Sequence, residues 1–263
     1  MAILESRTQT GLSWVKESIA LFKQSPRKWL MLALFYITFF VMLPSALHSI
    51  IFVVLTILIF PAFTALAMLM FKNADRGMSE PLSTMVTKLQ PKVSQLMLLG
   101  LVSLLYGILV GYFLNSDMQW LAKVSQMMQA QTSVSEQQAS LIIEKGLPIM
   151  LKLLLFSAPL LVVTWFSPML IAFNNYSLAK AIKSSIAGAI QYAVAMTAAG
   201  LALVAGLVLL MLVMGIFAGI MGKFIPASAQ FFMSFLIFGW LLVATALMLT
   251  FQYVSYRDVF RAA

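Results

Sequence analysis

Six long apolar stretches run through this sequence, and they limit the chain to folds that can exist in a lipid bilayer. A bilayer core about 30 Å thick is crossed by a helix of about 20 mostly apolar residues. None of the six stretches contains Asp or Glu. We expect six transmembrane helices, at residues 29–47, 49–71, 93–114, 147–173, 191–221 and 231–253.

The composition of the whole chain supports the same class. Of the 263 residues, 62% are hydrophobic and only 10% are charged, whereas soluble domains are about 45–50% apolar. A soluble fold of this length could not bury so much apolar surface. We therefore predict an all-α, polytopic membrane helix bundle that forms a single domain over residues 1–263.

The positions of the basic residues predict how the chain is oriented. Thirteen of the 17 Lys and Arg residues lie in the N-terminal segment, in the second and fourth interhelical connections and in the C-terminal tail. Loops that face the cytoplasm carry the excess of Lys and Arg. We expect a multi-pass protein of the bacterial inner membrane with both termini in the cytoplasm.

Three connections have the pattern of amphipathic helices with basic polar faces. They cover residues 11–24, within a predicted cytoplasmic segment 1–28, and residues 82–92 and 178–186. The apolar stripe of the first consists of Leu12, Val15, Ile19 and Phe22. Such helices lie in the plane of a membrane surface, with Lys and Arg toward anionic lipid.

Residues 115–146 form the only sizeable connection on the opposite side. Their pattern predicts an extracytoplasmic helical hairpin that ends at Gly146, with Pro148 starting the fourth span.

Several basic residues border the predicted spans and are candidate contacts for lipid headgroups, although orientation alone also explains them. Each such residue contributes about 1 kcal/mol near an anionic surface. The predicted partner is a bilayer containing anionic phospholipids. The candidates are Arg27, Lys28, Lys72, Arg76, Lys88 and Lys92.

Glycines at helical spacing in the third and fifth spans are candidates for close helix packing, because small residues let helices approach each other in lipid. They either pack within the chain or form the contact of a homo-oligomer. The candidates are Gly100, Gly107, Gly111, Gly215 and Gly219.

Prolines inside the second and fourth spans raise a second functional hypothesis. Pro159 and Pro168 are predicted to interrupt the fourth span, and Pro61 lies inside the second. Each of these prolines either kinks a packed membrane helix or marks unwound helix of the kind found at some transporter sites. Ion-coupled transport usually needs an ionisable group within the membrane, and the nearest candidate, Lys152, lies close to the end of its span.

Catalytic and cofactor chemistry finds no support in the sequence. The chain has no Cys and one His, His48, for which Asp117 is the only acidic partner that might approach on the predicted outer side. No phosphate-binding loop, dinucleotide fingerprint or carboxylate pair is present. We expect no enzyme activity, no cofactor, no metal and no nucleic-acid partner.

The sequence resembles a family of uncharacterised proteobacterial multi-pass inner-membrane proteins. The resemblance is carried by residues 11–14 (Gly-Leu-Ser-Trp), 21–22, 25–26 and 60–62, and by the ending at residues 256–260 (Tyr-Arg-Asp-Val-Phe). The layout is also similar to the membrane domain attached to some bacterial glycerophosphodiester phosphodiesterases, whose catalytic domain this chain lacks. The resemblance implies a fold and a location, and no reaction.

These patterns favour a non-catalytic scaffold or accessory factor for envelope components, with a membrane protein or a second copy of the chain as partner. The alternative is a transporter or lipid-translocating protein with a path near the second and fourth spans. A polar cavity between those spans would favour the alternative.

Overall fold

The computed structural model describes residues 2–130, 136–224 and 229–260, and every element within these ranges is helical. Six helical segments are long and apolar enough to cross a membrane. They are Pro26–Leu47, Ile50–Asp75, Leu82–Phe113, Ser140–Asn174, Ala193–Lys223 and Phe231–Val259. The predicted all-α bundle with six membrane-spanning helices is therefore confirmed.

The first spanning segment is a helical run that changes its winding midway. Pro26 occupies the first turn of this run, where its missing N–H is not needed. His48, in the left-handed conformation at φ 50°, and Ser49 then reverse the chain. The elements are α1 (Ala2–Gln24), α2 (Pro26–Ile37), the π-helix η1 (Thr38–Met42), α3 (Leu43–Leu47) and α4 (Ile50–Asp75).

The middle of the chain departs from the predicted boundaries. The helix α8 runs through Gly146, Pro148, Pro159 and Pro168 without a break, so the predicted helix end at Gly146 and the predicted interruptions are wrong. A proline removes one backbone hydrogen bond, and a membrane helix tolerates that loss. The elements are α5 (Leu82–Leu89), the 3-10 helix η2 (Gln90–Lys92), α6 (Val93–Phe113), α7 (Asn115–Ala130) and α8 (Glu136–Asn174).

The predicted hairpin at residues 115–146 corresponds to α7 and the first part of α8, and residues 131–135 lie outside the described ranges. The C-terminal part of the chain is a helical hairpin preceded by a short helix. Its elements are α9 (Leu178–Gln191), α10 (Ala193–Phe224) and α11 (Ala229–Val259).

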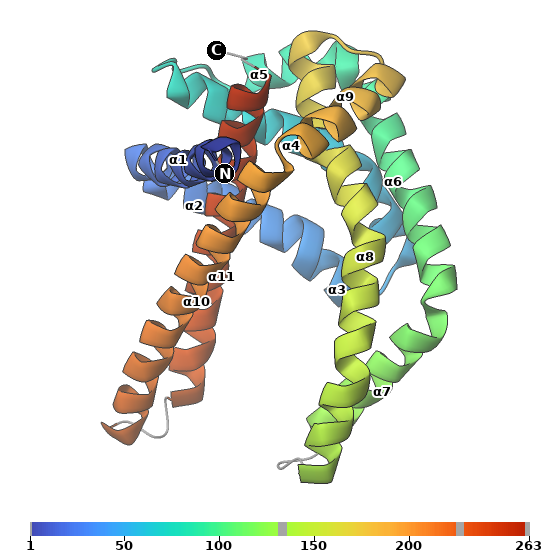
Figure 1. The fold of residues 1–263 in the computed structure, drawn as a ribbon, viewed down its shortest axis with the longest axis vertical. Coiled ribbons are helices and arrows are strands. Elements are labelled where there is room, and N and C mark those ends of the chain that lie inside the picture. Colours follow the sequence, from blue (N-terminus) through green and yellow to red (C-terminus); the bar gives the residue numbers. More distant parts are fainter. Residues whose placement is uncertain (1, 131–135, 225–228, 261–263) are drawn as a thin grey trace.

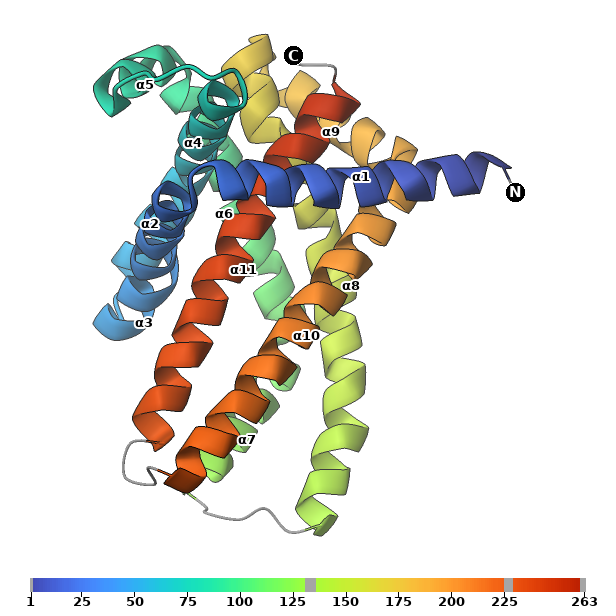
Figure 2. The same ribbon diagram turned by 90° about the vertical axis from the view of Figure 1, so that its left-hand side faces the viewer.

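The molecule has two unlike ends, visible in Figures 1 and 2. One end, called here the basic end, carries α1, α5, α9 and the C-terminus. The other, the far end, carries α7 and the C-terminal end of α10. In Figure 2, α1 runs across the spanning helices. The segments predicted to share one side of the membrane therefore do lie at one end of the bundle.

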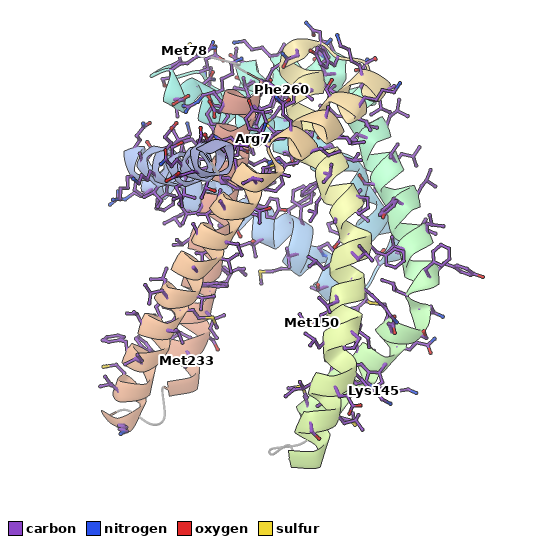
Figure 3. The ribbon with its side chains drawn as sticks, viewed as in Figure 1. Arg7, Met78, Lys145, Met150, Met233 and Phe260 are labelled. Atoms are coloured by element: carbon purple, nitrogen blue, oxygen red, sulfur yellow. The ribbon has the colours of Figure 1, made fainter. Side chains whose placement is uncertain are left out.

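The core is concentrated at the basic end. Its largest fully buried side chains include two tryptophans from α1 and α2 and aromatic residues from α4, α8 and α11; these are Trp14, Trp29, Phe71, Phe166, Tyr253 and Tyr256. Toward the far end the helices separate into two legs. One leg consists of α10 with α11, and the other contains α8 with α6 and α7. Met233 and Met150 mark the two legs in Figure 3.

The helix α1 is packed into the bundle by a stripe next to the one that was predicted to face lipid. It lies against α10 and α11, and the buried stripe consists of Gly11, Trp14, Ser18 and Leu21. Leu12, which belongs to the predicted apolar stripe, is 42% exposed. The predicted stripe therefore flanks the contact, because close helix contacts use small residues that hydrophobic periodicity does not detect.

Candidate functional site

A cluster of charged side chains joins three helices at the basic end. The Arg257 guanidinium of α11 donates two hydrogen bonds to Asp75 of α4, of 2.9 and 3.1 Å, and another to Glu17 of α1. The Tyr253 hydroxyl donates to the same Asp75 carboxylate at 2.9 Å. The side chain of Arg257 is only 25% exposed, so these bonds are partly shielded from solvent and are stronger than surface ion pairs.

Two further polar contacts extend this cluster. The Trp14 Nε1 of α1 donates to Asp258 Oδ2 at 2.7 Å, and the Tyr256 hydroxyl donates to Asn174 at the end of α8. Every described residue in the cluster therefore ties the C-terminal turns of α11 to another helix. The arrangement provides a structural clamp between α11 and its neighbours.

Sequence reasoning did not find this clamp. A usable signal was present, because the chain has only eight Asp and Glu residues and three of them, Glu17, Asp75 and Asp258, lie in the clamp. Acidic residues placed beside apolar spans are costly unless they are paired, which makes each of them a candidate contact.

The six predicted headgroup-contacting residues lie on α2, α4, α5, η2 and the α4–α5 connection, in the part of the molecule that includes the basic end. Lys88 forms a 2.6 Å ion pair with Glu80, and its hydrogen bond lowers the pKa of Glu80. Lys72 lies 4.8 Å from the Phe173 ring and Lys28 lies 5.0 Å from the Trp29 ring. The remaining three, Arg27, Arg76 and Lys92, have no ion pair with a described acidic residue.

Only one of the five predicted packing glycines meets another helix of the same chain. A Cβ at Gly100 would lie 2.6 Å from the Leu58 carbonyl oxygen of α4. At the other four, a Cβ would meet nothing within 4 Å among the described residues; these are Gly107, Gly111, Gly215 and Gly219. Helical spacing is thus insufficient for packing within the chain. Gly107 and Gly215 border cavities between helices, and Gly111 and Gly219 stay available to contacts from outside the chain.

A cavity of about 400 Å³ lies between the first four spanning segments. Its lining comes from α2 and η1, α4, α6 and α8, and four of its eleven lining residues carry a hydroxyl group; these are Tyr36, Thr56, Ser103 and Thr164. No lining residue is charged. A cavity is therefore present between the second and fourth spans, but most of its lining is apolar.

The far end of the α8 leg has a polar surface pocket of about 360 Å³. Here Lys152 of α8 forms a 3.0 Å ion pair with Asp117 of α7, and the Trp120 ring lies 3.8 Å from the position of a Cβ on Gly146. Lys152 is thus neutralised by α7. His48 contacts the Ala46 carbonyl oxygen at 3.1 Å and is not paired with Asp117.

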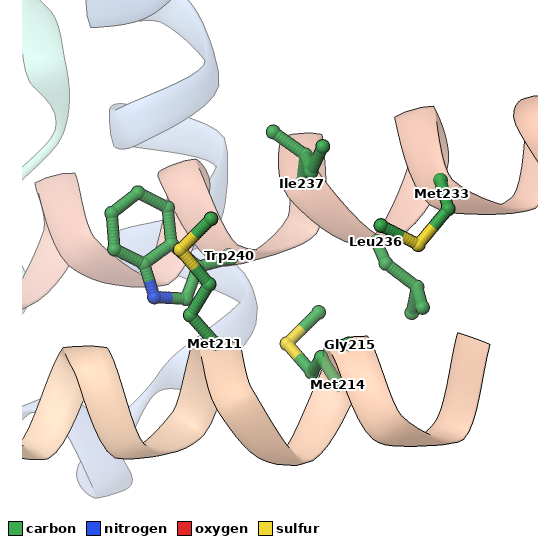
Figure 4. A pocket seen from close by; sticks show the side chains of 7 residues that line it. All are labelled: Met211, Met214, Gly215, Met233, Leu236, Ile237 and Trp240. Atoms are coloured by element: carbon green, nitrogen blue, oxygen red, sulfur yellow. The ribbon is translucent and has the colours of Figure 1, made fainter. Parts of the chain in front are cut away.

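A smaller apolar cavity of about 100 Å³ separates α10 from α11 near the far end (Figure 4). Three methionines and Gly215 contribute to its lining. The Trp240 Nε1 of α11 donates to the Leu207 carbonyl oxygen of α10 at 2.8 Å. This hydrogen bond joins the two helices of the leg where side-chain packing is incomplete.

These observations define the class of the protein as an all-α, multi-pass membrane protein. Within the described ranges, no three or more His, Cys, Asp or Glu side chains are grouped so that they could hold a metal ion. Comparisons with protein-family models, curated proteins and solved structures find no match.

Proposed function

We propose that this protein is a non-catalytic scaffold or accessory factor that holds another membrane component between its two legs. The supporting observation is the contrast between the ends of the bundle. The basic end is held by the clamp and the aromatic core, whereas α8 and α10 have no substantial contact along their described lengths. A bundle of this shape keeps two apolar helical surfaces apart at fixed positions.

The side chains on these surfaces suit a transmembrane partner. Leu201 and Leu212 of α10 and Leu155 of α8 are each more than half exposed, and Gly206 and Gly219 of α10 have free space at Cβ. In lipid, helices associate through close packing at small residues rather than through hydrophobic burial. A partner helix, from another protein or from a second copy of the chain, would satisfy both features.

The proposed location is the bacterial inner membrane, with the basic end in the cytoplasm. The distribution of Lys and Arg supports this orientation. A periplasm-active reporter fused after Asn115 is expected to be active, and the same reporter fused after Asn73 inactive. The reverse pattern would overturn the orientation while leaving the scaffold role untouched.

Site-specific photocrosslinking in cells tests the scaffold role. A photoreactive amino acid at Leu212 of α10 is expected to give one discrete protein adduct. The matched control is Ile108 of α6, which is also more than half exposed. In Figure 1, α6 lies on the other side of α8 from α10, and so outside the space between the two legs. Adducts with lipid alone at both positions, or the same protein adduct at both, would overturn the proposal.

A lipid-translocating protein is the second candidate, because the cavity lies between the second and fourth spans. Reconstitution into vesicles with a fluorescent phospholipid, followed by chemical quenching of the outer leaflet, separates the two roles. The scaffold proposal predicts the same protected fraction in protein-containing and protein-free vesicles. Loss of the protected fraction with the protein present would replace it with the translocating role.

A further inference from the structure

The cavity between α2, α4, α6 and α8 is lined by four hydroxyl groups, and they differ in whether their proton is already used in a hydrogen bond. The hydroxyl groups of Thr56, Ser103 and Thr164 each donate to a carbonyl oxygen of their own helix, over 2.8, 3.0 and 2.8 Å. A hydroxyl has a single proton to donate. These three groups can therefore offer a ligand only acceptor lone pairs.

The Tyr36 hydroxyl is the exception. It forms no hydrogen bond with the part of the chain that the structure describes, although its ring packs against Phe40, Phe60 and Phe63. Every fully buried side-chain nitrogen or oxygen among the described residues has a partner, so the Tyr36 oxygen is not sealed inside protein. In hydrocarbon, water is absent and an unpaired hydroxyl is costly.

The surroundings limit what could accept this hydrogen bond. The cavity is lined by no charged side chain, so a ligand with a net charge would remain uncompensated in a low-dielectric site. The lining residues Val41 and Leu161 are each about half exposed, so the cavity opens at the surface of two membrane-spanning segments. Its volume of about 400 Å³ lies within the range of small-molecule pockets, about 300–1,000 Å³.

We propose that this cavity binds an uncharged lipid through a carbonyl oxygen that accepts a hydrogen bond from the Tyr36 hydroxyl. The apolar remainder of the lipid packs against the aromatic and aliphatic lining and extends to the bilayer. Two lipid classes have this chemistry, the diacylglycerols with ester carbonyls and the lipid quinones with ring carbonyls. The proposal is tested separately from the scaffold role, whose crosslinking test is made on α10.

Competitive photolabelling of the full chain in phospholipid nanodiscs tests the proposal. The probe is a diacylglycerol with a diazirine in one acyl chain, and the adducts are mapped by mass spectrometry. The competitors are unlabelled diacylglycerol, a short-chain ubiquinone and hexadecane, which lacks a carbonyl. We expect adducts on the cavity-lining residues. One or both carbonyl compounds should compete with the probe at a concentration at least threefold lower than the concentration of hexadecane that competes equally well.

Two substitutions provide the mechanistic test. Tyr36→Phe keeps the ring contacts and removes the donor, and loss of one hydrogen bond in a membrane protein predicts about three- to tenfold weaker competition by the carbonyl compound. Gly107→Leu places a side chain in the cavity without a clash, since nothing lies within 4 Å of its Cβ, and is expected to abolish the cavity adducts. Gly111→Leu, about one turn along α6 and outside the lining, is the matched control and should label as the wild type does.

The outcomes separate clearly. Preferential competition by the quinone or by the diacylglycerol identifies the lipid class. Equal competition by hexadecane, unchanged competition in Tyr36→Phe, or equal labelling of Gly107→Leu and Gly111→Leu would each overturn the proposal. None of these results changes the crosslinking expected at Leu212, so failure of this inference and failure of the scaffold role are distinguishable.

Discussion

The crossing of α4 and α6 provides the sharpest test of the packing. At Gly100 a Cβ would lie 2.6 Å from the carbonyl oxygen and 2.7 Å from the Cα of Leu58. These are backbone atoms, which cannot rotate away as a side chain can. Gly100→Ala must therefore push the two helices apart, and overpacking of this kind costs about 1–3 kcal/mol.

The matched control is Gly107→Ala on the same helix, where a Cβ meets nothing within 4 Å. Alanine gains up to about 1 kcal/mol of helix propensity over glycine at both positions, so this gain cancels when the two variants are compared. The remaining difference is the steric cost at the crossing, about 1–3 kcal/mol. Gly100→Ala should be the less stable variant by that amount.

The measurement is the free energy of unfolding in mixed micelles, from a denaturing-detergent titration followed by tryptophan fluorescence. Equal stabilities of the two alanine variants would refute the close crossing of α4 and α6. A difference of the opposite sign would show that Gly107, and not Gly100, lies at a helix contact.

Three further predictions address the basic end. Gly11→Val should release α1 from α10, because a Cβ at Gly11 would overlap the Ala195 backbone. Proteolysis of α1 in detergent should then be faster than in the wild type. An unchanged proteolysis rate would contradict the docking of α1 on α10. Arg257→Gln should lower the free energy of unfolding by about 1–3 kcal/mol, since it removes charge-assisted hydrogen bonds, and the detergent titration measures it. The lowered pKa of Glu80 means that its interaction with Lys88 stabilises the fold above the ordinary Glu pKa of about 4.3 and is lost as pH falls through the folded value. The protection factors of the α5 amides, which correct for the intrinsic pH dependence of exchange, should fall over that range in the wild type. An equal fall in Glu80→Gln would contradict the assignment.

The spanning helices were predictable because the bilayer imposes a length and a composition on them. The third predicted span, residues 93–114, agrees with α6 to within one residue. Boundaries set by local breakers were less predictable. Gly146 and Pro148 have the pattern of a helix end, yet α8 continues through them, because a glycine or proline weakens a helix without determining where it stops.

The contacts between helices were not predictable in the same way. The hydrophobic period of α1 predicted a lipid-facing stripe through Leu12 and gave no sign of the buried stripe that passes through Gly11 and Ser18. The clamp at Arg257 joins residues from α1, α4 and α11, and no local pattern places them together. The cavity likewise depends on four segments whose spacing is set only when they pack.

The sequence by itself determined that the chain is an all-α membrane protein, because each apolar run must satisfy its own backbone hydrogen bonds in hydrocarbon. Only the tertiary structure decided which faces meet, where the two legs separate and which hydroxyl of the cavity lacks a partner among the described residues. The physical reason is that a helix face in lipid is apolar whether it touches a neighbour or an acyl chain. Hydrophobicity therefore locates the spans, and shape and hydrogen bonding select their partners.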